Sequence, residues 1–308
     1  KGGRKRNVKL TSRNYYAKAA NEAYFSVSQF KAFQKCEAAA MAELQGEFSP
    51  EYGRALLLGS YVDEMLTGTE KSQAKFIAEN YIELFQKSSK IVTALGKIET
   101  LSERKEFVMG LTELFHINNK PYADILQANE TIARVKEQPK MMHYLSGKHQ
   151  VIMTGEIEGV PFKIKMDSFD PNEYITDLKY MASLRSPNLF TPMVEYWGYD
   201  IQAAVYQEIV RQNIGKRLPF MFDVATKENP AHLALGEISQ YNMDKALDTV
   251  KSLVPRYQKI KTGELPAERC EDYGCDYCTY TKIITEPIDT DLFGMSTAQI
   301  NAMNGNIL

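Results

Sequence analysis

The fold is decided by two runs of sequence, Lys163-Ile164-Lys165-Met166-Asp167-Ser168-Phe169-Asp170 and, after a short polar turn, Tyr174-Ile175-Thr176-Asp177-Leu178-Lys179. Apolar and charged residues alternate toward Asp167, and the intervening Pro171-Asn172 is a turn sequence, so the pattern predicts a β-hairpin. Because side chains alternate between faces along a strand, Asp177 and Lys179 point one way and Leu178 points into the opposite layer. Pairing of the two strands brings Asp167 alongside Asp177.

Two carboxylates and an ammonium on one strand face suit a hard cation with a positive group beside it. Metal-assisted hydrolysis of a phosphodiester needs this arrangement. An Asp-x-Lys pair is, however, also common on the solvated face of antiparallel strands. The pair therefore needs support from the rest of the chain before it indicates catalysis.

The composition is that of an ordinary globular protein. The chain has 308 residues, of which 44% are hydrophobic and 25% are charged, and its formal net charge is −2. This length allows one large domain or two small ones. We expect no membrane span, no signal peptide and a cytoplasmic location, because no apolar run approaches ~20 residues. Any contact with nucleic acid must rely on locally concentrated positive charge.

We expect three regions along the chain. Residues 1–23 form a basic flexible arm, residues 24–285 form one folded domain, and residues 286–308 form a C-terminal tail. The fold class is α/β with mixed α+β character, because helical periodicity surrounds a central stretch with a period of two. The prediction is a mixed central β-sheet flanked by helices, with a helical insertion at about 68–148 and a core hairpin at 150–180.

The individual elements follow from the same periodicities. Ser26 or Ser28 caps the first helix, and Cys36 lies in the middle of that helix. The run from Lys87 to Lys97 is expected to be a loop. We predict helices at 24–45, 51–67, 71–87, 102–114, 121–136, 138–146, 193–213 and 243–261, and strands at 151–158, in the hairpin, at 218–226 and at 232–239.

Four motifs between Ser26 and Cys278 resemble those of the PD-(D/E)xK nuclease superfamily, specifically its RecB/RecE-like branch and the phage and prophage RecE-type exonucleases. Each motif alone is weak, but together, in this order and spacing, they indicate the family. The resemblance implies that residues 24–285 form a nuclease domain with a restriction-endonuclease-like core. The motifs are Ser26-Val27-Ser28-Gln29-Phe30-Lys31-Ala32-Phe33-Gln34-Lys35-Cys36, Gly59-Ser60-Tyr61-Val62-Asp63, Asp167…Asp177-Leu178-Lys179 and Gln202-Ala203-Ala204-Val205-Tyr206.

The resemblance also implies a role for each residue of the central motif. Asp167 and Asp177, assisted by the Leu178 carbonyl, would bind Mg²⁺ or Mn²⁺ through oxygen ligands. Lys179 would orient the attacking water or stabilise the developing charge. The motif is therefore expected to supply both the metal ligands and the catalytic cation.

The flanking motifs add further site residues by the same resemblance. Asp63 stands where the family usually has a histidine, and its carboxylate could bind the same cation; Glu64 takes this role if the register is off by one. Gln202 and Tyr206 would position the substrate strand or order Lys179. For Tyr206, a helix face packed on the sheet is an equally good interpretation.

The four cysteines of the chain are unevenly placed, with Cys36 alone and Cys270, Cys275 and Cys278 together. Disulfides are not expected in a cytosolic protein of this size. The spacing resembles that of the iron–sulfur members of the superfamily, the AddB-like and CRISPR-adaptation nucleases, and so implies a 4Fe–4S cluster. Four thiolates suit Zn²⁺ equally well, and reduced cysteines without a metal are the third interpretation.

The resemblance thus implies a metal-dependent DNA exonuclease of phage or prophage recombination, acting in the cytoplasm of a bacterial host. Such an enzyme degrades one strand of linear duplex DNA and passes the exposed strand to an annealing protein of RecT type, often as a homo-oligomer. Two alternatives remain open. One is a CRISPR-adaptation- or repair-type nuclease acting on single strands, and the other is a non-catalytic DNA-binding protein that retains the fold.

Overall fold

The computed structural model describes residues 9–49, 53–86, 120–187, 191–270 and 275–283, together with the single residues 295, 299 and 302. The predicted loop at 87–97, the predicted helix at 102–114, the first eight residues of the arm and nearly all of the tail at 286–308 lie outside this description. The chain divides into two compact units. Unit 1 comprises Lys1–Glu51, Ile152–Ile164 and Asp244–Leu308, and unit 2 comprises Tyr52–Val151 and Lys165–Met243.

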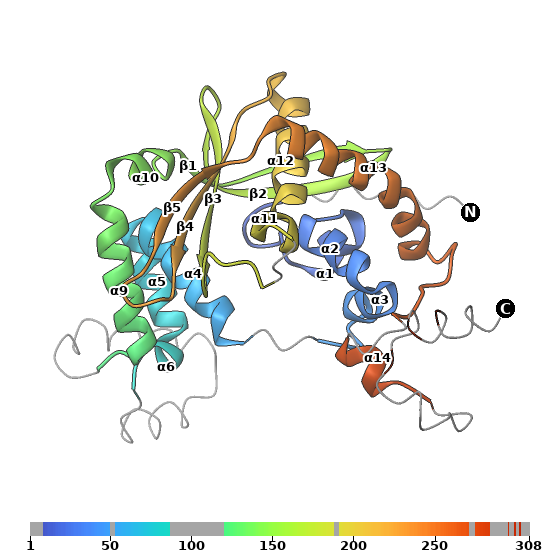
Figure 1. The fold of residues 1–308 in the computed structure, drawn as a ribbon, viewed down its shortest axis with the longest axis horizontal. Coiled ribbons are helices and arrows are strands. Elements are labelled where there is room, and N and C mark those ends of the chain that lie inside the picture. Colours follow the sequence, from blue (N-terminus) through green and yellow to red (C-terminus); the bar gives the residue numbers. More distant parts are fainter. Residues whose placement is uncertain are drawn as a thin grey trace. The chain divides into compact units, whose positions relative to one another are not determined.

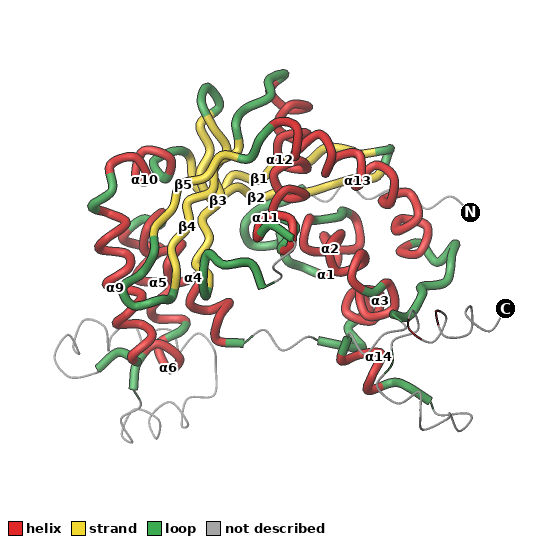
Figure 2. The backbone as a smooth tube through the Cα atoms, viewed as in Figure 1, coloured by secondary structure: helices red, strands yellow, loops and turns green. Residues whose placement is uncertain are grey.

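A five-stranded mixed sheet is the central element, as the sequence predicted (Figures 1 and 2). The second and third strands pair antiparallel, the third and fourth pair parallel, and the fourth and fifth pair antiparallel. The boundary between the units falls within the first and second strands. The strands, in their order across the sheet, are β1 (Lys148–Ile157), β2 (Val160–Asp170), β3 (Tyr174–Met181), β4 (Phe220–Thr226) and β5 (Leu233–Glu237).

The register of β2 and β3 is the one that the hairpin pattern requires. Ser168 pairs with Thr176, so one further step in the same register places Asp167 across from Asp177. On its other side β3 pairs in parallel with β4, where Asp177 lies beside Phe222. The two aspartates are therefore neighbours on adjacent strands.

Helices of unit 2 cover both faces of β3 and β4 (Figure 1). On one face, Leu178 and Ala225 belong to a buried cluster with residues from four of these helices, α4, α6, α9 and α10. On the other face, α12 packs Tyr199 against Phe222, with ring centroids 5.3 Å apart. The helices of this unit are α4 (Arg54–Thr67), α5 (Glu70–Glu79), α6 (Tyr81–Leu84), α9 (Ala123–Lys136), α10 (Pro139–Tyr144), α11 (Met193–Tyr196) and α12 (Tyr199–Ile214).

Unit 1 is built around a cluster of buried aromatic rings. The ring centroids of Phe30 and Phe33 each lie 5.4 Å from that of Tyr257, and the centroid of Phe25 lies 5.8 Å from that of Phe162. Such pairs contribute dispersion in addition to apolar burial. The helices of this unit are α1 (Lys18–Ala23), α2 (Val27–Lys35), α3 (Glu37–Gln45), α13 (Gln240–Lys261, from Asp244 onward) and α14 (Asp276–Tyr280).

Three predicted helices are interrupted in the structure. The helix at 24–45 breaks at Cys36, whose φ of −164° is extended, so Cys36 lies between α2 and α3 rather than within one helix. The helix at 71–87 breaks at Asn80, whose side chain donates to the Phe76 carbonyl and ends α5. The helix at 193–213 breaks at Gly198, which adopts the left-handed conformation that favours glycine. The predicted cap is confirmed: Ser26 Oγ accepts a hydrogen bond from the Gln29 N–H at the start of α2.

The folded part of the chain also begins earlier than the expected arm at 1–23 allows. Residues 18–23 form α1, and Tyr15 is buried. The buried Lys163 ammonium donates to the Tyr15 carbonyl and to Asn21 Oδ1, which holds this segment against β2. Within the described residues, no helix is both long and apolar enough to cross a membrane.

Candidate active site

Asp177, Lys179 and Gln202 form a closed network of polar contacts in unit 2. Lys179 Nζ lies 2.5 Å from Asp177 Oδ2. The Gln202 amide donates to Asp177 Oδ1 at 2.5 Å, and its carbonyl accepts from Lys179 Nζ at 3.1 Å. Because both charges are largely buried, hydrogen bonds that complete their shells are needed to offset desolvation. The structure thus brings these three predicted site residues together.

The start of α12 explains how Gln202 reaches β3. Gly198, with φ of 61° and ψ of 39°, turns the chain so that α12 begins at Tyr199. Gln202 lies in the first turn of this helix, above the sheet. The Tyr199 ring also faces the site, with its centroid 4.9 Å from Lys179 Nζ, a distance at which a cation is attracted to the ring face.

Lys179 remains an ammonium in this environment. Burial by itself lowers the pKa of the Lys179 amine, but the neighbouring Asp177 carboxylate more than offsets burial and raises the pKa above its ordinary value. A fixed positive charge therefore lies on the same strand face as Asp177.

Two more carboxyl groups approach this network. Asp167 Oδ2 accepts a hydrogen bond from the Leu178 N–H at 3.0 Å. Burial, followed by the charges of Asp177 and Asp63, raises the pKa of Asp167 well above its ordinary value. Burial also raises the pKa of Asp63, on α4, to about 6, with a further contribution from Asp177. The three carboxyl groups are therefore close enough to repel one another when ionised.

Gln150 is a site residue that the sequence did not indicate. Its amide Nε2 lies 3.0 Å from Asp63 Oδ2 and 3.4 Å from Asp167 Oδ1, so it joins the two carboxylates. Its backbone φ is 52°, a left-handed conformation within the strand β1. Non-glycine residues adopt it at a cost, and such strained positions are enriched at functional sites. No sequence pattern marks this position, because a positive φ breaks the period of two.

The structure places the remaining predicted residues as follows. The Tyr206 hydroxyl donates to the Lys165 carbonyl at 3.0 Å and its ring packs on Phe220, which matches the interpretation of a packed helix face. Glu64 folds back toward Gly68, so Asp63, rather than Glu64, shares Gln150 with Asp167. The Leu178 side chain lies in the core, as predicted.

Asp223 is a further buried carboxyl group that the sequence did not single out. It pairs with Leu178 across β3 and β4, and its side chain is fully buried. Burial raises the pKa of Asp223 to about 7. The alternation of side chains puts it on the sheet face opposite Asp177, so it is not part of the candidate site.

The donor set of Asp63, Asp167 and Asp177 fits a hard divalent cation such as Mg²⁺ or Mn²⁺. All three supply carboxylate oxygens, which are the ligands such cations prefer. Burial first, and neighbouring carboxylates second, raise the pKa values of Asp63 and Asp167, so both groups are costly to ionise where they lie; a bound cation would offset that cost. Asp177 Oδ2 is also buried without a hydrogen-bond partner, apart from its ion pair with Lys179.

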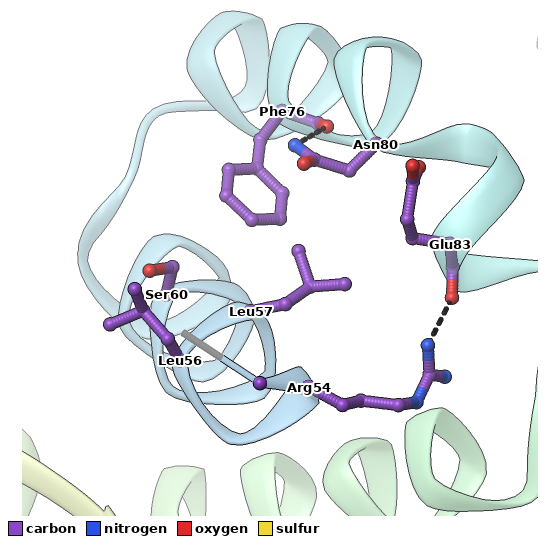
Figure 3. Close-up of a pocket in the computed structure, with 8 residues that line it drawn as sticks. Arg54, Leu56, Leu57, Ser60, Phe76, Asn80 and Glu83 are labelled. Atoms are coloured by element: carbon purple, nitrogen blue, oxygen red, sulfur yellow. Dashed lines mark hydrogen bonds between the residues drawn. The ribbon is translucent and has the colours of Figure 1, made fainter. Parts of the chain in front are cut away.

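A separate cavity of about 540 Å³ lies between α4, α5 and α6 (Figure 3). Arg54 on its rim is bound by Asp124 and donates to the Glu83 carbonyl at 2.7 Å. None of the predicted site residues lines this cavity. Its lining consists of Gly53, Arg54, Leu56, Leu57, Ser60, Phe76, Asn80 and Glu83.

The four cysteines meet in unit 1, as the sequence predicted. One ligand atom from each lies within 4.8 Å of all the others. Cys36 Sγ lies 3.5 Å from Cys278 Sγ, and Cys270 Sγ lies 3.3 Å from Cys275 Sγ. Burial raises the pKa of the Cys36 thiol, but hydrogen bonds from backbone amides and neighbouring thiols outweigh it and leave that pKa at about 7. Burial and hydrogen bonds with neighbouring thiols instead raise the pKa values of Cys270 and Cys278. Binding of a metal through all four thiolates would therefore release protons.

Ion pairs next to the cysteines hold the two distant segments together. Arg256, on α13, makes two hydrogen bonds to Glu37 at 2.7 and 2.9 Å and lies 2.8 Å from Glu268. The Glu268 N–H in turn donates to Glu37 at 2.9 Å. Because Glu37 follows Cys36 and Glu268 shortly precedes Cys270, this bidentate network helps to position both ligands.

The mixed sheet, the helices on both faces and the Asp-x-Lys strand together define a fold of the PD-(D/E)xK class, with a restriction-endonuclease-like core. A model of the PDDEXK-like domain of unknown function DUF3799 matches residues 26–281, so the chain belongs to this family. A crystal structure of a protein from Eubacterium rectale, provisionally described as an exonuclease, has 37% sequence identity and a TM-score of 0.76. The match covers 94% of this chain and 99% of that one. Among curated proteins, no match was found.

We predict that shortening Gln150 weakens metal binding. The variant Gln150→Asn tolerates a positive φ but withdraws the amide from Asp63 and Asp167, so the pKa values of both carboxyls should rise. Protonated carboxyls do not bind the cation, so wild-type affinity for Mn²⁺ should fall as the pH drops through the pKa of Asp63, about 6. In the variant, the pH at which half of the Mn²⁺ affinity is lost should be higher than in the wild type, and binding at pH 6.5 should be about tenfold weaker.

Isothermal titration calorimetry with MnCl₂ between pH 5.5 and 8 measures both effects. Glu158→Asn is the matched control, because Glu158 also has a positive φ of 50° but lies in the turn between β1 and β2. An unchanged affinity and pH midpoint in Gln150→Asn would show that the amide does not organise the carboxylates.

Proposed function

We propose that the protein is a metal-dependent DNA exonuclease that hydrolyses phosphodiester bonds of linear duplex DNA. The observation that carries this proposal is the closed Asp177–Lys179–Gln202 network with Asp63 and Asp167 beside it. Membership of the PDDEXK-like family supports nuclease chemistry in general. The exonuclease assignment draws on the Eubacterium rectale protein, which is provisionally described as an exonuclease. Its structure matches this one over nearly the full length of both chains.

The proposed chemistry assigns separate tasks to the site residues. A divalent cation bound by Asp63, Asp167 and Asp177 would lower the pKa of a bound water and offset charge at the scissile phosphate. Lys179, kept as an ammonium by Asp177, would stabilise the negative charge that develops on that phosphate. Gln202, which is hydrogen-bonded to both groups, would fix the position of the Lys179 ammonium relative to the Asp177 carboxylate. Tyr206 would act indirectly, by fixing the backbone of β2 at Lys165.

The biological setting that we propose is phage or prophage recombination in the bacterial cytoplasm. It rests on the resemblance of the four motifs to RecE-type exonucleases. In that setting the exposed strand would pass to an annealing protein of RecT type, and a homo-oligomer would keep the enzyme on its substrate. A single-strand nuclease of the CRISPR-adaptation or repair type is the second candidate, favoured by the four clustered cysteines.

We further propose that the four cysteines hold a metal centre that ties α3 to the segment around α14. The resemblance to AddB-like nucleases favours a 4Fe–4S cluster. The spacing favours Zn²⁺, because thiolates around one tetrahedral ion lie ~3.8 Å apart for Zn–S bonds of about 2.3 Å, and the Sγ atoms here lie within 4.8 Å. Both occupants would use the same four thiolates, so metal analysis distinguishes them.

The nuclease proposal predicts a specific pattern of activity. With Mg²⁺ or Mn²⁺, the wild-type protein should degrade end-labelled linear duplex and leave covalently closed circles intact. Asp177→Asn and Lys179→Met should each lower the rate by about 10²-fold or more, because each removes charge that acts in the transition state. Gln202→Leu should lower it by about 10- to 100-fold through loss of positioning.

Asp223→Asn is the matched control for this assay, since it makes the same chemical change on the opposite face of β3 and β4 and should keep full activity. Linear single strands, tested in parallel, distinguish the two candidate functions. If the wild-type protein leaves both linear duplex and single strands intact with Mg²⁺ and with Mn²⁺, nuclease activity is excluded. The remaining hypothesis is then the non-catalytic DNA-binding protein.

The cysteine proposal predicts that anaerobically purified protein contains thiolate-bound metal. A 4Fe–4S centre would give a brown protein with about four iron and four sulfide ions per chain; a zinc centre would give a colourless protein with about one zinc ion. In either case Cys275→Ser should lower the metal content. Protein that is free of both metals, with four titratable thiols, would contradict the proposal.

A further inference from the structure

Two exposed aromatic rings lie at the end of α11, where Tyr196 is the last helical residue and Trp197 follows it. Tyr196 is 45% exposed and Trp197 is 46% exposed. Their centroids are 4.9 Å apart and their planes meet at 85°, so the Tyr196 ring supports the Trp197 ring edge-to-face. Single exposed apolar residues are common on protein surfaces, but here two adjacent rings form one contiguous exposed apolar surface.

This aromatic pair is fixed close to Lys179. The Tyr199 ring lies 4.9 Å from Lys179 Nζ, and Trp197 precedes Tyr199 by two residues. Their Cα atoms are therefore no more than about 7.6 Å apart, since consecutive Cα atoms are 3.80 Å apart. Gly198 between them is buried and adopts a left-handed conformation, which sets the direction of the turn.

The chemistry of this surface favours a nucleobase over a phosphate. Glu195 and Asp200 flank the rings in sequence, and carboxylates repel phosphate oxygens. Aromatic rings, in contrast, stack on the faces of unpaired bases in proteins that bind single strands. Because Trp197 is two residues from Tyr199, whose ring lies 4.9 Å from Lys179 Nζ, a base next to a phosphate at Lys179 is the part of the substrate that these rings would meet.

We propose that Trp197, supported by Tyr196, is a stacking platform for an unpaired nucleobase next to the scissile phosphate. The inference deepens the proposed nuclease function, on which it rests, by naming the part of the substrate that this surface binds. Bases are paired and stacked inside a duplex, so the platform selects a frayed or single-stranded end. Trp197 is thus a specificity-determining residue for DNA ends.

Trp197 is the only tryptophan of the chain, so its fluorescence reports on this surface alone. The probe is a fluorescein-labelled oligothymidine, added to the full-length wild-type protein in EDTA to prevent hydrolysis. Stacking predicts saturable quenching of tryptophan emission in parallel with the rise in probe anisotropy. An abasic strand of equal length should bind without this quenching.

Substitution separates stacking from a structural role. Trp197→Ala should bind oligothymidine about tenfold more weakly, within the range measured for loss of one base–aromatic stack. The slope of affinity against salt should not change, because no phosphate contact is lost. Trp197→Phe should restore most of the affinity, and the abasic strand should bind the wild-type and alanine proteins equally well.

Tyr241→Ala is the matched control. Tyr241 is more exposed, at 77%, but it lies away from the Lys179 end of α12. Its neighbour Gln240 is hydrogen-bonded to Gln207, and Gln207 is eight residues, or about 12 Å, along α12 from Tyr199. Three results would each contradict the stacking proposal: oligothymidine binding without quenching of tryptophan emission, the same oligothymidine affinity in Trp197→Ala as in the wild type, or no binding of oligothymidine. Because these measurements need no hydrolysis, retained quenching together with absent cleavage would overturn the nuclease activity alone.

Discussion

The Gln202 amide links the charges of Asp177 and Lys179, and the candidate site depends on this contact. One end of the amide donates to the carboxylate and the other accepts from the ammonium. Hydrogen bonds to charged groups contribute about 1.5–3 kcal/mol each, and a buried charge without them is costly. The first turn of α12 must therefore lie above β3 at this position, and the Gly198 turn makes that placement possible.

The sequence predicted the central residues because their positions follow from regular periodicities. A period of two along β3 puts Asp177 and Lys179 on one face and Leu178 in the core, and the structure has this arrangement. The hairpin register then brings Asp167 beside Asp177. The order of elements from β1 to α13 and the convergence of the cysteines also follow from local patterns combined with family resemblance.

The features that the sequence did not predict depend on tertiary contacts or unusual backbone conformations. A positive φ at Gln150 interrupts the regular alternation of side chains along β1, so a period of two does not assign its side chain to the site. Around Cys36 the sequence favours an uninterrupted helix, but the contacts of Cys36 with Cys278 and of Glu37 with Arg256 outweigh helix propensity and separate α2 from α3. Lys163 resembles a solvated strand residue, yet backbone and amide oxygens bind its ammonium in the interior.

The central claim is that the carboxylates of Asp63, Asp167 and Asp177 converge to bind one divalent cation beside Lys179. Anomalous diffraction from a crystal soaked in Mn²⁺ tests this claim most directly, because it locates the ion without reference to activity. The account predicts one strong anomalous peak bonded to oxygens of these three aspartates, with the Gln150 amide next to it. A crystal saturated with Mn²⁺ that shows no peak among these residues, or binds the ion elsewhere, would contradict it.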